Sequence, residues 1–171
     1  VDIYEVSTGE WSVGTSGPVP PGGSQAVLVG NKAYSAGTAQ MTEFDIDTET
    51  WTNCEGSCAA PPALNGRAAA AHGGRVYLFG GYDSGAMASS VNVSEFDPAG
   101  NAFTDCGGTC ADMPTARRFF DAHVMGDRIY AIGGFNGTDQ LDVVEEFDPA
   151  SNTWTNCGGT CAPIPLGRSS Y

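Results

Sequence analysis

Arg128-Ile-Tyr-Ala-Ile-Gly-Gly134 and, a short loop later, Glu146-Phe-Asp-Pro-Ala-Ser-Asn-Thr-Trp154 are the stretches of sequence that decide the fold. The first is a short run of aliphatic and aromatic residues ending in two glycines, which is typical of a β-strand followed by a turn. In the second, Pro149 presets φ and Asn152 tolerates a left-handed conformation, so a tight turn is expected before Trp154. Together the two stretches predict short antiparallel strands joined by tight turns.

The same pattern recurs along the whole chain. One aromatic residue precedes another by seven positions in four copies, whose first members stand at positions 4, 44, 96 and 147. The spacings between these copies are therefore 40, 52 and 51 residues. Counterparts of the Gly-Gly stretch lie at Lys32–Gly37 and Arg75–Gly81, between successive aromatic pairs. Repeats of this length indicate an architecture built from several copies of one structural unit.

Each repeat is predicted to form four antiparallel strands, here named a to d. Strand a is expected at 24–29, 68–72 and 119–123, and strand b is the stretch that ends in the glycines. Strand c carries the first aromatic residue, and strand d begins at the second. His72 and His123 are expected at equivalent places at the end of strand a, as structural rather than catalytic residues. No helical period of useful length occurs, so the predicted fold class is all-β.

This pattern resembles the kelch repeat, and the resemblance covers essentially the whole chain. Two departures are Ala36-Gly37 where two glycines are usual and Phe103 where a tryptophan is usual. The resemblance implies a kelch-type β-propeller of four-stranded antiparallel blades, with three full blades and partial blades at both ends. The expected segments are 1–16 for strands c and d of a preceding blade, 17–58, 59–110 and 111–161 for full blades, and 162–171 for the start of the next.

The predicted blades do not close a ring. Closed propellers use about four to eight blades, and open ends would expose sheet faces. We therefore expect the remaining blades to come either from the same polypeptide, of which this chain would be a part, or from another copy. A simple dimer is disfavoured because strand a at the C-terminal end would meet strand c at the N-terminal end with no strand b between them.

Six cysteines form three Cys-x-x-x-Cys units, each placed just after strand d. A disulfide within each unit is the simplest interpretation, because glycines inside the units permit a sharp turn. Each closure should stabilise the fold by roughly 2 kcal/mol in the chain-entropy model. Structural zinc usually needs four ligands, and no further ligand is near any of the units in sequence. The predicted disulfides join Cys54 to Cys58, Cys106 to Cys110 and Cys157 to Cys161.

Disulfides imply an oxidising location, which is extracellular, periplasmic or within an organelle lumen. Asn92 and Asn136 each begin an Asn-x-Ser/Thr sequence, so they are candidate glycosylation sites of a eukaryotic secretory protein. No apolar run approaches the roughly 20 residues that span a bilayer. The chain opens Val-Asp-Ile-Tyr without the features of a signal peptide, and we expect the original N-terminus to lie upstream.

The charge is strongly one-sided. Lysine and arginine together number 7, aspartate and glutamate 20, and the formal net charge is −13. Such a surface repels nucleic-acid phosphates and anionic membranes, so neither is an expected partner. A protein partner is favoured, with a cationic patch as one possible match, and a glycan is also compatible.

The loops after strands b and d should emerge on one face, because successive antiparallel strands alternate in direction. The resemblance implies that partners bind this face, often through arginines at the start of strand a. An alternative is that these arginines brace the contact between blades. The candidate binding residues are Arg67, Arg117, Arg118, Arg168, Tyr82, Asp83, Phe135, Asn136 and Asp139.

These observations predict a non-catalytic protein-interaction or scaffold module. No Ser-His-Asp order, metal-ligand cluster or phosphate-binding loop is visible, so no catalytic residue, metal or cofactor is expected. One alternative is the scaffold of a propeller enzyme that is similar to galactose oxidase or to sialate mutarotases. Another is a glycan-binding propeller that uses Tyr82 and Phe135.

Overall fold

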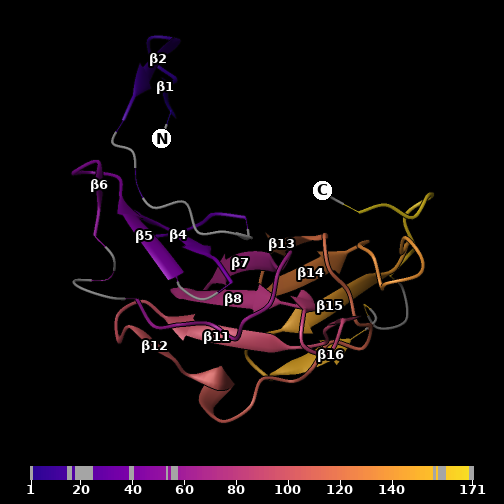
Figure 1. Cartoon of the computed structure of the whole chain (residues 1–171). Helices are drawn as coiled ribbons and strands as arrows, with labels where there is room; N and C mark the ends of the chain where they lie inside the picture. Colours follow the sequence, from indigo (N-terminus) through magenta and orange to yellow (C-terminus); the bar gives the residue numbers. More distant parts are fainter. Residues whose placement is uncertain are drawn as a thin grey trace.

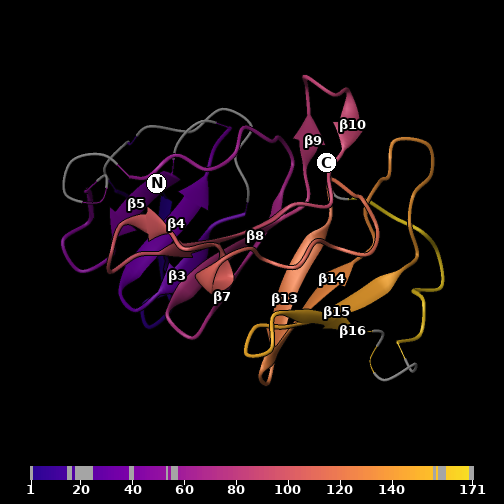
Figure 2. The ribbon, with the colours of Figure 1, turned by 90° about the horizontal axis from the view of Figure 1, so that it is seen from below.

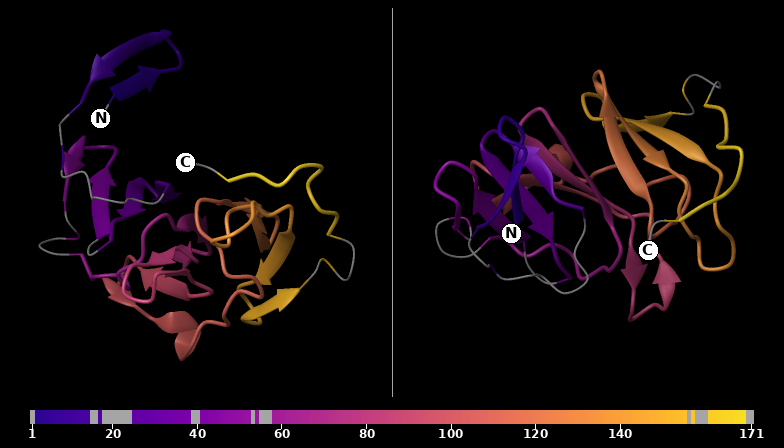
Figure 3. Two further views of the ribbon diagram at one scale, coloured as in Figure 1. Left: turned by 45° about the vertical axis from the view of Figure 1, so that its right-hand side comes forward. Right: turned by 90° about the horizontal axis from the view of Figure 1, so that it is seen from above.

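The computed structural model describes residues 2–14, 17, 25–38, 41–52, 54, 58–155, 157 and 161–169. It is built from three four-stranded antiparallel sheets, called the first, second and third blades, and two smaller strand pairs. Figures 1 and 3 show the sheets side by side around an arc, with the β1–β2 pair at one end. The all-β kelch-propeller prediction is confirmed, and the connection after β12 contains a 3-10 turn, η2 (Asp105–Gly107).

In each blade the strands pair in chain order. The first blade contains β3 (Val27–Val29), β4 (Lys32–Ala36), β5 (Met41–Asp45) and β6 (Thr50–Trp51). The second contains β7 (Ala68–His72), β8 (Arg75–Phe79), β11 (Val93–Asp97) and β12 (Ala102–Phe103). The third contains β13 (Asp121–Met125), β14 (Arg128–Ile132), β15 (Val144–Asp148) and β16 (Thr153–Thr155). The smaller pairs are β1 (Asp2–Glu5) with β2 (Glu10–Val13), and β9 (Tyr82–Asp83) with β10 (Ala88–Ser89). The segment boundaries expected from the sequence stay a prediction.

Strand a of the third blade lies two residues later than the sequence predicted. Phe119 has a left-handed backbone with φ 53°, so the strand begins only at Asp121. Two-residue turns then pair His72 with Arg75 and Met125 with Arg128. The expectation that His72 and His123 are equivalent is therefore wrong, because His72 corresponds to Met125. His123 is exposed and lines a groove of about 380 Å³ between the first strands of the blades.

The hydrophobic core lies in the seams between blades. Alternate residues of β7 and β8 point to opposite neighbours, as expected for strands covered on both faces. One cluster joins the first and second blades and contains Tyr34, Ala36, Met41, Cys58, Ala69, Val76, Leu78 and Phe96. The other joins the second and third blades and contains Ala68, Ala70, Tyr77, Phe79, Val93, Cys110, Met113, Phe120, Ala122, Ile129, Ala131 and Phe147. Of the aromatic residues on strand c, Phe96 and Phe147 belong to these seam clusters, and both are completely buried.

The glycines after strand b allow two blades to approach closely. Gly80 has φ 60°, and a Cβ atom there would collide with the carbonyl oxygen of Arg117 and lie 2.9 Å from the Phe120 ring. Gly81 donates its N–H to the same Arg117 carbonyl at 2.9 Å. A side chain at position 80 would therefore separate the second blade from the third.

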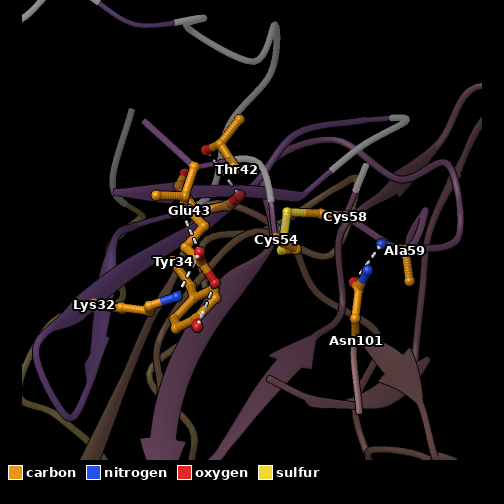
Figure 4. Close-up of a disulfide and its surroundings, with 10 residues drawn as sticks. Lys32, Tyr34, Thr42, Glu43, Cys54, Cys58, Ala59 and Asn101 are labelled. Atoms are coloured by element: carbon orange, nitrogen blue, oxygen red, sulfur yellow. Dashed lines mark hydrogen bonds and ion pairs between the residues drawn. A yellow bond between two sulfur atoms is a disulfide. The ribbon is translucent and has the colours of Figure 1, made fainter. Parts of the chain in front are cut away.

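A cross-strand polar network ties strands b, c and d of the first blade together. The hydroxyl of Tyr34 donates to Glu43 at 2.6 Å, and Lys32 pairs with the same carboxylate at 2.9 Å (Figure 4). Thr52 also donates to Glu43. Burial alone would raise the pKa of Glu43, but these donors hold the pKa below its usual value. Tyr130, Glu146 and Thr155 form the same arrangement in the third blade, at 2.6 Å for each contact.

Candidate functional site

Two long loops project from one face of the propeller, here called the loop face. It carries the connections that follow strands b and d, which include residues 80–92, 104–120 and 133–143. In the second blade the connection forms the β9–β10 hairpin, which stands clear of the sheets in Figure 2. At its tip Asp83 accepts hydrogen bonds from the N–H groups of Gly85 at 2.8 Å and Ala86 at 3.0 Å. The turn presents Met87 to solvent, with 78% of its surface exposed.

The loop of the third blade is built in a similar way. The side-chain oxygen of Asn136 accepts hydrogen bonds from the N–H groups of Thr138 at 2.8 Å and Asp139 at 2.7 Å. Phe135 bridges to Arg118 and to Gln140, which fixes both ends of the loop. Asp139 is exposed at the turn. The two loops therefore present ordered polar turns with aromatic residues at their bases.

Arg118 joins the bases of these two loops. Its guanidinium lies over the Tyr82 ring at 4.4 Å and over the Phe135 ring at 5.1 Å. Cation–π contacts of this kind are favourable, and more so when they are partly desolvated. Ser89 adds a second link, because its hydroxyl donates to the carbonyl oxygen of Phe135 at 3.2 Å. The predicted residues Tyr82, Phe135 and Arg118 thus form one cluster that crosses the seam.

Arg117, the next residue, points into the protein instead. Its guanidinium is completely buried, pairs with Glu145 at 2.7 Å and donates to the carbonyl of Gly133 at 2.9 Å. Thr115 donates to the same carboxylate at 2.6 Å. Burial lowers the pKa of Arg117, and the charge of Glu145 works against that effect. The bracing role that the sequence left as an alternative describes Arg117.

The predicted equivalence of Arg67 with the other arginines is wrong. The carbonyl of Arg117 accepts a hydrogen bond from Gly81, and the carbonyl of Arg168 accepts one from Gly134 at 2.7 Å, so these two arginines correspond. The bridges of Asn65 to Tyr82 and of Arg118 to Phe135 also correspond. Counting along the chain from these two bridges, Leu64 corresponds to Arg117, and Arg67 corresponds to Phe120.

Arg67 is therefore a charged residue at an apolar seam position. Only 5% of its surface is exposed, and among the residues that the structure describes none provides a hydrogen-bond acceptor for its three guanidinium nitrogens. Burial lowers the pKa of Arg67 to about 10, so the group stays charged at neutral pH. A buried charge without a partner destabilises the folded state.

We predict that the same substitution has opposite effects at the two buried arginines. Arg67→Met should raise the free energy of unfolding by about 1–4 kcal/mol, because it removes an unpaired charge and keeps the packing volume. Arg117→Met should lower it, because Glu145 would lose its partner. Urea unfolding of the oxidised protein measures both. A loss of stability in Arg67→Met would show that the guanidinium has an acceptor in solution.

The cysteines lie as three close pairs, which fit the predicted disulfides. The Cα atoms are 4.9 Å apart in Cys54–Cys58 and 5.0 Å apart in the other two pairs. Cys58 and Cys110 are buried members of the two seam clusters. Figure 4 shows the first disulfide beside Ala59, whose N–H donates to Asn101. Each of these two units therefore also packs against the following blade.

Several important residues were not identified from the sequence. Glu145 differs from its counterparts Ser94 and Thr42, and that change was the available signal for a buried ion pair. Asn92 is half-buried and accepts a hydrogen bond from Ser94 at 3.0 Å, while its use as a glycosylation site stays a prediction. Among the described residues, no three His, Cys, Asp or Glu side chains gather as a metal site. The described segments contain no helix with the length and apolarity that a membrane span requires.

Comparison with solved structures supports the propeller fold. The structure titled "Structure of YjhT" matches with a TM-score of 0.73 and 20% sequence identity, covering 92% of this chain and 56% of that one. Together with the blade topology and the repeated seams, this places the chain in the class of kelch-type β-propellers.

Sequence comparisons identify the family. The chain belongs to the KLHDC2/KLHL20/DRC7 Kelch-repeats domain family, whose profile matches residues 1–171. It is 26% identical over 167 residues to Kelch domain-containing protein 3 of Bos taurus, covering 87% of this chain and 43% of that protein. It is 25% identical over 181 residues to Kelch-like protein 25 of Xenopus tropicalis, covering 100% of this chain and 28% of that protein. The chain thus spans less than half the length of these relatives.

Proposed function

We propose that this chain is a non-catalytic protein-interaction module whose partner binds the loop face. Kelch-repeat propellers commonly serve as scaffolds for protein interaction. The observation that carries the proposal is the Arg118 cluster, where one guanidinium lies over aromatic residues of two neighbouring blades. It holds two projecting loops in a fixed relation, which reduces the entropy lost when a partner binds both.

The chemistry of the loop face favours a partner with basic and apolar groups. Asp139 and Asp142 are exposed on the third blade, and Asp83 lies near the tip of the β9–β10 hairpin. The exposed Met87 adds a flexible apolar contact of the kind used at adaptable binding surfaces. With a net charge of −13, the protein would attract a cationic partner at low ionic strength.

The three cysteine pairs support a function in an oxidising compartment, either extracellular, periplasmic or luminal. Each disulfide closes a small loop after strand d and so restrains the connection that runs across the loop face to the next strand a. We therefore propose a secreted or luminal interaction module, in which all six cysteines of the chain form disulfides.

A glycan-binding function is less well supported. Sugar rings stack on exposed aromatic faces, but Tyr82 and Phe135 are both half-buried with the Arg118 guanidinium over them. For a propeller enzyme, a similarity of fold alone does not identify a reaction. In the protein-interaction proposal the two rings have a different role, because they hold the Arg118 guanidinium between the bases of the two loops.

Site-specific photocrosslinking tests the proposal. A photoreactive residue in place of Met87 should crosslink a partner from the secreted or luminal protein fraction of the source cells. The matched control replaces Met125, which is also an exposed methionine, with 56% of its surface accessible, but lies at the turn on the opposite face. Crosslinks at position 87 that weaken with rising salt are expected. Identical products at both positions, or none above background at position 87, would contradict the proposal.

A further inference from the structure

The chain contains two Asn-Gly sequences, and the structure places them in different surroundings. Asn136-Gly137 lies in the loop of the third blade on the loop face, whereas Asn65-Gly66 lies in the connection that precedes β7. An asparagine followed by glycine can lose its side-chain amide without an enzyme. The nitrogen of the glycine attacks the side-chain carbonyl carbon, and no Cβ atom shields that nitrogen. The freedom of the backbone decides whether this reaction occurs in a folded protein.

The peptide between Asn136 and Gly137 is not fixed by hydrogen bonds. The N–H of Asn136 donates to Asp139 at 3.2 Å, but among the described residues none binds the carbonyl of Asn136 or the N–H of Gly137. Gly137 is exposed, with φ 113°, and a Cβ atom placed there would have nothing within 4 Å. Hydroxide can therefore reach the Gly137 nitrogen, and the peptide can turn toward the asparagine side chain.

The side-chain oxygen of Asn136 is held in a way that favours the attack. It accepts hydrogen bonds from the N–H groups of Thr138 at 2.8 Å and Asp139 at 2.7 Å. Negative charge develops on this oxygen when the nitrogen attacks, so the two donors are placed as in an oxyanion hole. The hydrogen bond from Thr138 also closes a ring of atoms that contains both the side-chain carbonyl carbon and the Gly137 nitrogen. The turn thus holds the two reacting atoms together.

Asn65-Gly66 has the same two residues on a fixed backbone. The N–H and the carbonyl of Asn65 both bind Tyr82, at 3.1 Å and 2.7 Å. The carbonyl of Gly66 accepts a hydrogen bond from Phe119 at 2.9 Å, and the Phe119 ring lies 2.5 Å from the place of a Cβ atom on Gly66. Ring closure at Asn65 would require this peptide to rotate and would break the bridge to Tyr82.

We propose that Asn136 is a site of spontaneous deamidation in the folded protein and that Asn65 is protected. Hydroxide removes the amide proton of Gly137, and the nitrogen attacks Cγ of Asn136. The N–Cγ bond forms, the Cγ–Nδ2 bond breaks, and the leaving group takes a proton from water to become ammonia. Water then opens the resulting cyclic imide. Breaking the new N–Cγ bond gives aspartate, and breaking the original peptide C–N bond gives isoaspartate.

The two products change the loop differently. Aspartate keeps an oxygen acceptor in the turn and adds a negative charge close to the exposed Asp139. Isoaspartate lengthens the main chain by one carbon atom and removes the side-chain carbonyl that accepted the two hydrogen bonds, so the turn directly after Phe135 opens. Partner binding at the loop face would then change with the age of the protein. This consequence rests on the proposed function, whereas the reaction itself does not.

The purified protein tests the proposal. Protein made in a bacterial periplasm, where Asn136 receives no glycan, is incubated at mildly alkaline pH in buffer and in urea, and peptides are quantified by mass spectrometry. In urea both Asn-Gly sequences should react at similar rates. In the folded protein Asn136 should keep a comparable rate, whereas Asn65 should slow about a hundredfold, because its reaction waits for local opening. The rate at Asn136 should rise with pH.

Two variants at Thr138 test the contribution of the backbone donor. Thr138→Ala is the matched control, because it removes the hydroxyl and keeps the N–H that binds Asn136, so its rate should be unchanged. Thr138→Pro removes that N–H and should slow the reaction about tenfold. Continued protection of Asn65 in the same sample shows that each variant is folded. An unchanged rate in Thr138→Pro would contradict the role assigned to the donors.

Three results would overturn the proposal. Asn136 could keep its amide in the folded protein while the urea sample reacts, or both asparagines could react equally fast in the folded protein. Aspartate formed without isoaspartate would indicate direct hydrolysis instead of ring closure. All of these measurements use the protein alone, so the absence of a loop-face partner in the crosslinking experiment would not affect them.

Discussion

Replacing Glu145 by serine will lower the free energy of unfolding by about 3–5 kcal/mol, because it leaves the Arg117 charge buried without a carboxylate. Arg117 is completely buried and the ion pair measures 2.7 Å, so water cannot take over the role of the lost carboxylate without opening the seam. Urea unfolding of the oxidised protein, followed by tryptophan fluorescence, measures the change.

The second blade provides the control for this prediction, since it has Leu64 and Ser94 where the third has Arg117 and Glu145. The double variant Arg117→Leu with Glu145→Ser reproduces that apolar version. It should be more stable than Glu145→Ser alone by about 1–2 kcal/mol, because no buried charge remains. A double variant less stable than the single one would show that the carbonyls bound by Arg117 matter more than the charge pair.

Gly80→Ala is expected to destabilise the protein by about 3 kcal/mol or more. Two effects add here, the left-handed backbone and the collision of the new Cβ atom with the Arg117 carbonyl and the Phe120 ring. The carbonyl cannot move away without breaking its hydrogen bond to Gly81. Thermal unfolding of the oxidised protein reports the loss.

Gly126→Ala separates the two effects. Gly126 also has φ 60°, but nothing lies within 4 Å of a Cβ atom placed there. Its substitution should therefore cost only the backbone term, about 1–2 kcal/mol. Equal losses at positions 80 and 126 would show that the seam between the second and third blades relaxes to accept a methyl group.

The sequence was sufficient to predict the blades because their signals are local and repeated. Paired glycines, seven-residue aromatic spacing and Asp-Pro turns each act within one hairpin, and the copies reinforce one another. The start of β13 was misplaced because Phe119 adopts a left-handed conformation that aromatic residues seldom take, so no local preference marks it.

The candidate site was predicted less completely, because it depends on contacts between blades. Tyr82, Phe135 and Arg118 were selected individually, and only the structure shows that one guanidinium covers both rings. Arg67 was aligned with Arg117 by residue type, although backbone register places it with Phe120. Two adjacent arginines with opposite orientations cannot be distinguished by composition or spacing alone.

Because the core lies between blades rather than within them, no blade is an independent folding unit. The smallest unit that can unfold cooperatively is a pair of neighbouring blades. The stability of the whole is approximately the sum of the contributions from each contact between neighbouring blades. A defect in one seam should therefore melt the adjoining blades together while more distant ones persist. The exposed turns of the projecting loops, around Met87 and Asp139, contribute little to these contacts between blades, so their sequences are free to diverge and change binding specificity without altering the architecture that supports them.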